Sequence, residues 1–133
     1  MNIPSATIRI KNLRLRTYIG FNDDEKQNKQ DIVINIEIRH AIHNAVYSDQ
    51  VQSALNYKTI TKAVIHLVEN DRFLLLEKLT ADILQLCSED SSVEHAVVQV
   101  DKPHALRFAD SVSITLEYDA NIHYQNFKLE KAS

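Results

Sequence analysis

The stretch that decides the fold is Gln30-Asp31-Ile32-Val33-Ile34-Asn35-Ile36-Glu37-Ile38-Arg39-His40-Ala41-Ile42, in which apolar and polar residues alternate. Four isoleucines occupy every second position of this segment, and the positions between them are mostly polar. Successive side chains of a β-strand point to opposite faces of a sheet, so this pattern predicts a strand with one buried face.

A second long strand is predicted ahead of it, from Thr7 to Ile19. Its alternation runs through Ile8 and Ile10 and then changes phase, and the inward positions continue at Leu13, Leu15, Thr17 and Ile19. A change of phase of this kind indicates a β-bulge near Lys11-Asn12. The polar and acidic residues 20–29 are predicted to connect the two strands.

Two helices are predicted next, over residues 57–70 and about 73–87. Each carries its apolar residues on one helical stripe, namely Ile60, Ala63, Val64, Leu67 and Val68 in the first and Leu75, Leu76, Leu79, Ile83 and Leu86 in the second. The link Asn70-Asp71-Arg72 between them holds good capping residues. We expect both helices to pack side by side on the isoleucine face of the sheet.

Strands predicted at 92–102 and 111–118 complete the order strand, strand, helix, helix, strand, strand. The sequence therefore predicts one α+β domain over residues 1–133, with its core in residues 7–118 and a polar, peripheral tail in residues 119–133. A four-stranded, mostly antiparallel sheet would carry helices on one face only. Because such a sheet has two unprotected edges, we expect several copies to assemble into a closed ring.

Composition excludes several classes of protein. A net charge of -3 argues against a general nucleic-acid or membrane binder. The single cysteine, Cys87, cannot form an internal disulfide, and neither a secretory signal nor a membrane-length apolar run is visible. We therefore expect a cytoplasmic protein without nucleic-acid or membrane partners.

Phosphate, metal and nucleophile motifs are also missing from the sequence. Gly20 is the only glycine, so phosphates could be bound only by basic side chains or helix N-termini. The six histidines are scattered without the spacing of metal ligands, and Cys87 has the position of a core residue. We expect no metal and no cofactor.

Lys102 closes the predicted strand 92–102 and stands directly before Pro103. Proline fixes its own backbone and favours an extended residue before it, so the lysine amine leaves the strand at a defined angle. In a partly dry pocket such an amine can serve as a base. The alternative is an ordinary solvated lysine at the end of a strand.

Three further residues lie at junctions between predicted elements, where pockets form. Glu25 lies in the first connection, Tyr57 at the start of the first helix, and Glu77 in an early turn of the second. Each also has a purely structural reading, as a solvated acid, a packed aromatic ring, or a charge that favours a helix N-terminus.

Four short motifs appear in a fixed order, Ile19-Gly20 followed by Glu25, Leu55-Asn56-Tyr57, Leu76-Glu77-Lys78-Leu79 and Asp101-Lys102-Pro103. Together they resemble the dihydroneopterin aldolase and dihydroneopterin triphosphate 2'-epimerase family, from about Ile8 to Tyr118. The resemblance implies a tunnelling fold (T-fold), in which four subunits close their sheets into a barrel and two rings stack into a homo-octamer. It also implies a small-molecule pterin substrate, bound between subunits.

The resemblance further implies roles for these residues. Glu77 would accept two hydrogen bonds from the pterin ring, and Leu76 and Asn56 would contact the substrate beside it. Lys102, through a water, would remove the 2'-hydroxyl proton, and a retro-aldol cleavage would follow with the reduced ring as the electron acceptor. Tyr57 would move a proton at the resulting enol-like intermediate, and Glu25 would orient Lys102.

Within the family, residues 9–17 and 104–112 resemble segments of the epimerase, and His104 stands where aldolases more often have glycine. The resemblance thus implies epimerisation at C2' of 7,8-dihydroneopterin triphosphate towards dihydromonapterin triphosphate and tetrahydromonapterin, with weak aldolase activity at most. As a hypothesis of our own, His104 and Arg107 bind the triphosphate, with Arg14, Arg16 and Lys58 as weaker candidates. The alternatives are an aldolase that releases glycolaldehyde in folate biosynthesis and a non-catalytic pterin-binding oligomer.

Overall fold

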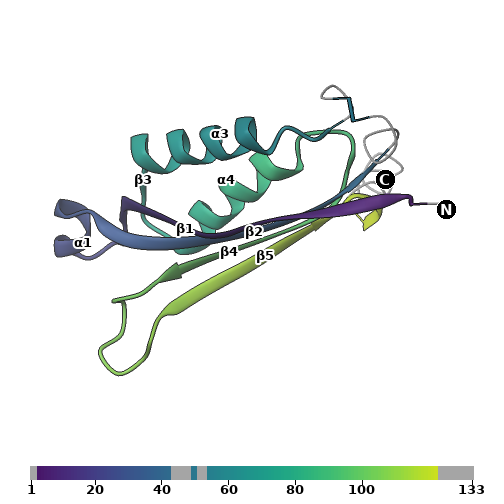
Figure 1. Ribbon diagram of the computed structural model, residues 1–133. Helices are drawn as coiled ribbons and strands as arrows, with labels where there is room; N and C mark the ends of the chain where they lie inside the picture. The colour runs from purple at the N-terminus through teal and green to yellow at the C-terminus, as the bar shows by residue number, and fades with distance from the viewer. Residues whose placement is uncertain (1–2, 43–48, 51–53, 123–133) are drawn as a thin grey trace, which may run out of the picture.

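The computed structural model describes residues 3–42, 49–50 and 54–122 (Figure 1). Along the chain, its elements are β1 (Ser5–Ile19), α1 (Asp23–Gln27), β2 (Gln30–Ala41), α3 (Tyr57–Asn70), β3 (Arg72–Phe73), α4 (Leu76–Ser88), β4 (Val93–Lys102) and β5 (Val112–Asp119). The α+β class and the order of the four long strands and two long helices are confirmed. A short helix, α1, was not predicted and occupies the connection between the first two strands.

The strands form one sheet in the order β3-β1-β2-β4-β5. The four long strands pair antiparallel with their neighbours, as expected, whereas β3 pairs parallel with the end of β1. The predicted link between the helices is confirmed only in part, because Asp71 caps the C-terminus of α3 but Arg72 belongs to β3. Arg72 and Phe73 extend the sheet by pairing with Tyr18 and Ile19, and α4 consequently begins at Leu76.

The predicted β-bulge is confirmed in β1. The register of β1 against β2 shifts between Ile10 and Leu13, and Asn12 has a positive φ of 54°. The Asn12 backbone N–H donates a 2.9 Å hydrogen bond to Oδ1 of Asn35, so the bulged residue keeps a partner. The bulge lets both halves of β1 keep their apolar side chains on the same face.

Helices α3 and α4 cover one face of the sheet (Figure 1), and the core lies between the two layers. The four isoleucines of β2 are at most 2% exposed and meet Val64 and Val68 of α3 and Leu79, Ile83 and Cys87 of α4, which are fully buried. Burial raises the pKa of the Cys87 thiol to about 12, as expected for a core residue. Leu75 was wrongly placed on the apolar stripe, because it precedes the helix as its N-cap and is half exposed.

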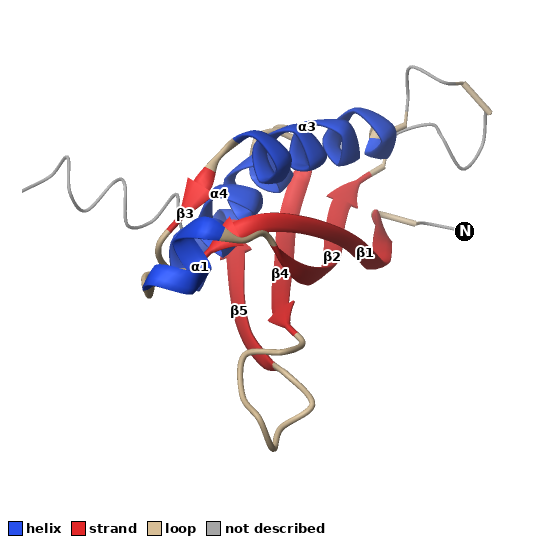
Figure 2. Ribbon diagram, turned by 90° about the vertical axis from the view of Figure 1, so that its left-hand side faces the viewer, coloured by secondary structure: helices blue, strands red, loops and turns tan. Residues whose placement is uncertain are grey.

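Several elements lie together at one end of the sheet. Helix α1, β3 and the start of α4 lie at this end, together with the end of β4, and α3 runs towards it from near the middle of the sheet (Figure 1). Figure 2 views the molecule from the α1 end. The long loop between β4 and β5 extends beyond the sheet at the α1 end. Strand β5 runs to Asp119 and residues 120–122 are helical, so the predicted tail starts later than expected, and its residues 123–133 lie outside the described part.

Candidate active site

An ion pair joins two of the residues that were singled out in the sequence. The Nζ atom of Lys102, the last residue of β4, lies 2.6 Å from Oε2 of Glu25 in α1. The side chains are 13% and 19% exposed, so the pair is largely shielded from water. A shielded charge pair interacts more strongly than one at the surface, and the lysine amine is held at a fixed place at the end of the strand.

Helix α1 holds the Glu25 carboxylate through a capping box. The Asn22 side chain accepts a 2.9 Å hydrogen bond from the backbone N–H of Glu25, and Oε1 of Glu25 accepts one from the backbone N–H of Asn22. The Lys102 ammonium lowers the pKa of the Glu25 carboxyl most, and the donors of Gln30 and Asn22 add to this against the opposing effect of burial. Glu25 is therefore an ionised, oriented partner for Lys102 and not a solvated loop acid.

Gln30 belongs to this site although sequence reasoning did not select it. Its Nε2 atom donates to the carbonyl oxygen of Ile19 at 2.6 Å and to Oε2 of Glu25 at 3.3 Å. It thereby ties the carboxylate to the end of β1. The only signal in the sequence was a polar residue at the first position of a strand whose next residues alternate regularly.

Gly20 is required by the close approach of the Glu25 carboxylate. Its φ of +123° is one that residues with a side chain rarely adopt, and a Cβ atom at this position would overlap the carboxyl group of Glu25. The backbone N–H of Gly20 also donates to the carbonyl oxygen of Phe73 at 3.0 Å. The single glycine of the chain therefore stands where the ion pair, β1 and β3 meet.

The predicted pterin anchor lies at the same end of the molecule. Glu77 is exposed in the first turn of α4, and Leu76 before it is buried. The chain reaches this turn from β3, which is fixed to Gly20 and so to the neighbourhood of Glu25. The N-cap residue Leu75 makes no side-chain capping hydrogen bond, which leaves N–H groups of the first turn for a ligand.

Tyr57 and Asn56 lie at the start of α3, away from the Lys102 and Glu25 ion pair. The hydroxyl of Thr17 near the end of β1 donates to the Val68 carbonyl oxygen at 2.6 Å, which fixes the last turn of α3 near the ion pair. Tyr57 begins this helix, roughly 16 Å further along its axis. Asn56 caps the helix by accepting from the Thr59 N–H at 3.1 Å. One chain therefore does not bring Tyr57 to Lys102.

The phosphate candidates are divided between several places. His104 lines a cavity of about 280 Å³ together with Glu25 and Asp24, and its Nε2 lies 3.7 Å from Oδ2 of Asp31. Arg107, further along the loop, lies over the ring of its neighbour Phe108 at 5.5 Å.

The weaker candidates are more distant or already engaged. Arg16 forms an ion pair with Asp31 at 3.1 Å, and Arg14 is exposed on the helix-free face of β1. Lys58 lies at the far end of α3, beside Tyr57.

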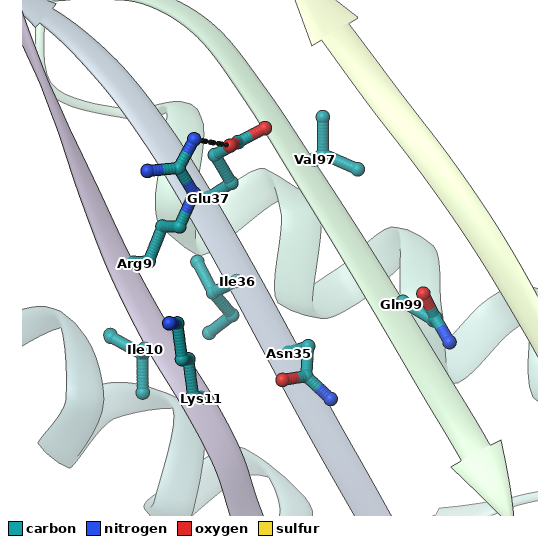
Figure 3. Close-up of a pocket in the computed structure, with 8 residues that line it drawn as sticks. All are labelled: Arg9, Ile10, Lys11, Asn35, Ile36, Glu37, Val97 and Gln99. Carbon is teal, nitrogen blue, oxygen red and sulfur yellow. Dashed lines mark ion pairs between the residues drawn. The ribbon is translucent and has the colours of Figure 1, made fainter.

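A separate pocket lies on the helix-free face of the sheet (Figure 3). It has a volume of about 270 Å³, and an ion pair of 2.7 Å between Arg9 and Glu37 forms one side of it. Lys11, Asn35 and Gln99 line other parts, as the close-up shows. None of the predicted site residues lines this pocket.

The described residues contain no group of three metal-ligating side chains that could hold an ion. Among the helices of the same residues, none is long and apolar enough to cross a membrane.

Comparisons with known proteins identify the family of this chain. The family model of dihydroneopterin aldolase (FolB) matches residues 8–117. Dihydroneopterin triphosphate 2'-epimerase of Escherichia coli (strain K12) is 55% identical over 115 residues, which cover 86% of this chain and 96% of the relative. The dihydroneopterin aldolase of the same strain is 29% identical over 117 residues, covering 88% and 96%.

A solved structure shows the same fold. E. coli dihydroneopterin aldolase in complex with neopterin superimposes with a TM-score of 0.79 and 28% sequence identity, over 85% of this chain and 98% of that one. The T-fold predicted from the sequence is confirmed by this likeness.

Proposed function

Because this chain belongs to the dihydroneopterin aldolase family, we propose that it is a pterin epimerase, which inverts C2' of 7,8-dihydroneopterin triphosphate to give dihydromonapterin triphosphate. The position of Lys102 beside Glu25 carries this proposal, because the reaction needs a basic group held at a fixed place. Lys102 acts as the base once its ammonium group has released a proton. The much higher identity to an epimerase than to an aldolase of the same bacterium supports epimerisation.

The pterin ring binds at the start of α4. The Glu77 carboxylate accepts two parallel hydrogen bonds from the ring amino group and a ring N–H, and Leu76 lies beside it. A ring without these donors would leave the carboxylate unpaired and would therefore bind poorly. This contact also directs the hydroxylated side chain towards Lys102.

The chemistry then proceeds at the ion pair. The neutral amine of Lys102, through a water, takes the proton of the 2'-hydroxyl and becomes an ammonium group. The C1'–C2' bond then breaks, and its electron pair moves into the reduced pterin ring. An aldehyde and an enol-like pterin result. The bond re-forms on the opposite face of the aldehyde to give the epimer, and Glu25 keeps the lysine amine oriented throughout.

Tyr57 and Asn56 are supplied to this site by a neighbouring subunit. The distance between the start of α3 and the end of β4 supports a site between copies, because Tyr57 begins α3 far from Lys102. Among the described residues, β5 and the part of β1 before Tyr18 have no neighbouring strand on one side. These edges support a ring in which sheets of neighbouring copies join. We propose a homo-octamer of two stacked four-membered rings, acting in the cytoplasm.

Binding of the triphosphate by His104 and Arg107 remains a prediction. His104 shares a cavity with Glu25. Arg107 is on the same loop but stacks on Phe108. Neither residue is needed for the bond-breaking step of the proposed reaction.

The second candidate function is a dihydroneopterin aldolase, which uses the same residues and is the name of the matching family model. In that reaction Tyr57 protonates the enol-like intermediate and the aldehyde leaves. A non-catalytic pterin-binding oligomer is the third candidate. It would keep the Glu77 contact without needing the Lys102 amine.

The deciding experiment compares two substrates. We expect the protein to convert dihydroneopterin triphosphate to its 2' epimer with a higher kcat/KM than unphosphorylated dihydroneopterin, as measured by chromatography of the dephosphorylated pterins. Lys102→Ala should remove the activity and keep pterin binding. Preferred cleavage of the unphosphorylated compound with release of glycolaldehyde would instead establish the aldolase, and full activity of Lys102→Ala would disprove the assigned base.

A further inference from the structure

One side of the Lys102 and Glu25 ion pair is acidic. The cavity on this side is lined by Asp24 and His104 beside Glu25. His104 itself faces the Asp31 carboxylate at 3.7 Å. A chain of phosphates that entered this side would meet carboxylates at close range, which is electrostatically unfavourable.

The other side of the ion pair, which faces β3, carries basic residues. The guanidinium carbon of Arg72 lies 3.8 Å from the centre of the Tyr18 ring, and Nζ of Lys29 lies 5.8 Å from the same point. Nη1 of Arg72 donates to the carbonyl oxygen of Lys26 at 3.0 Å. We call Lys26, Lys29 and Arg72 the basic flank.

The cations of the basic flank are not engaged in ion pairs. Throughout the described ranges, none of its three members forms an ion pair with a carboxylate, whereas Arg9, Arg16 and Arg39 do. The charged groups of Lys29 and Arg72 both lie at the Tyr18 ring, so they attract an anion to the same region. Stacking on a ring and one hydrogen bond fix the guanidinium of Arg72 and leave further donors unused.

The residues of the basic flank adjoin the elements that hold the ion pair. Tyr18 and Arg72 form one pair of the β1–β3 ladder, and Gly20, which supports the Glu25 carboxylate, follows Tyr18 after about 7 Å of extended strand. Lys26 is the residue after Glu25 in α1. Along the chain, Tyr18, on which the flank stacks, is therefore two residues from Gly20, and Lys26 is one residue from Glu25 on α1.

We propose that the basic flank binds the triphosphate of the substrate, so that the phosphate chain runs from the ion pair towards β3 and not along the β4–β5 loop. This inference rests on the proposed function and names the part of the same site that selects a phosphorylated substrate. Arg72 forms the central contact, because a planar guanidinium matches two phosphate oxygens at once. An unphosphorylated side chain ends short of the flank and gains nothing from it.

The test compares single substitutions that each remove one positive charge. Arg72→Gln and Lys29→Ala remove cations of the flank, Arg107→Ala removes the cation of the loop, and Lys62→Ala removes an exposed lysine of α3 as the matched control. Epimerisation of dihydroneopterin triphosphate and of dihydroneopterin is measured for each at low and moderate salt.

We expect Arg72→Gln to lower kcat/KM for the triphosphate by about tenfold or more and to change that for dihydroneopterin less than twofold. Lys29→Ala should have a smaller effect in the same direction that fades at higher salt. Lys62→Ala should resemble the wild type. If Arg107→Ala removes the preference for the triphosphate while Arg72→Gln keeps it, the inference is overturned.

Binding of inorganic tripolyphosphate, measured by calorimetry, separates this inference from the proposed function. We expect the wild type to bind it and Arg72→Gln to bind it at least about tenfold more weakly. Equal binding by both proteins overturns the inference. A wild type that shows no preference for the phosphorylated substrate overturns the proposed epimerase, whereas the tripolyphosphate comparison still reports on the basic flank.

Discussion

At the residue scale, the site depends on contacts between residues that are far apart in the chain. Lys102 and Glu25 are 77 positions apart and meet at 2.6 Å. Gln30 and Gly20 then determine where the carboxylate can lie, the first by donating to it and the second by leaving room for it. A lysine before a proline becomes a candidate base only because these neighbours hold its partner.

The lowered pKa of Glu25 predicts a pH dependence of stability. Because the folded state binds the Glu25 proton less tightly than the unfolded chain, ionised Glu25 stabilises the fold above its unfolded pKa, near 4.5. This contribution is lost as the pH falls from there through the lowered folded pKa. The free energy of unfolding, measured in urea between about pH 3 and 7, should fall less steeply below pH 5 for Glu25→Gln than for the wild type.

The free energy of unfolding of Glu25→Gln at neutral pH serves as a control for this comparison. The variant should be less stable there, because the ammonium of Lys102 stays buried beside a neutral group. Parallel curves for the two proteins over the whole acid range would contradict the assigned cause of the shift.

At the element scale, three short elements prepare the site: α1, β3 and the first turn of α4. Helix α1 presents Glu25, β3 ties Gly20 and Phe73 together, and α4 begins soon after with Glu77. Helix α3 joins this group only at its last turn, through the hydrogen bond from Thr17 to Val68. The attachment of α3 to β1 therefore stabilises the fold without a contact to Glu25 or Lys102.

Thr17→Val tests the attachment of α3. The substitution keeps the size of the buried side chain and removes the donor to the Val68 carbonyl, which lies in the last turn, where helical partners are missing. We expect a loss of about 1–3 kcal/mol in the free energy of unfolding, measured by urea denaturation. The kcat at a temperature well below unfolding should stay close to that of the wild type, because no proposed catalytic group is moved. A variant as stable as the wild type would show that this hydrogen bond does not stabilise the helix.

At the scale of the whole molecule, the residues of the proposed site are divided between two parts of the chain. Glu25 lies beside Lys102, whereas Tyr57 begins α3, roughly 16 Å along the helix axis from its last turn. The proposed ring would bring these parts of neighbouring copies together. It would also protect β5 and the part of β1 before Tyr18, which have no neighbouring strand on one side among the described residues.

Complementation between two inactive variants tests this arrangement. We expect Lys102→Ala and Tyr57→Ala, each inactive alone in the release of aldehyde from dihydroneopterin, to recover about a quarter of the wild-type rate after joint refolding in equal amounts. Each site takes Lys102 from one chain and Tyr57 from its neighbour. Each of these chains carries the intact residue in about half of the cases, so about a quarter of the sites are complete.

Wild-type protein carried through the same refolding serves as the control. The absence of recovered activity in mixed oligomers, whose formation is checked with differently tagged chains, would show that the two residues act within one chain.

The sequence by itself determined the elements with regular patterns. The isoleucines of β2 and the stripes of α3 and α4 are repeated signals, and the phase change in β1 located its bulge correctly. The four site motifs also stood in a recognisable order, so that Glu25 and Lys102 could be selected before their contact was known. Strand β3 could not be predicted, because a two-residue strand has no periodicity and exists only through its pairing with β1.

Tertiary structure alone decided how these residues act. Gln30 and the basic flank carry no local pattern, since their roles come from contacts between α1, β1 and β3. The need for glycine at position 20 likewise follows from a carboxylate that another element places above it. Local periodicity depends on residues that are close in the sequence, whereas the distances within a site depend on the packing of segments that are far apart in the chain.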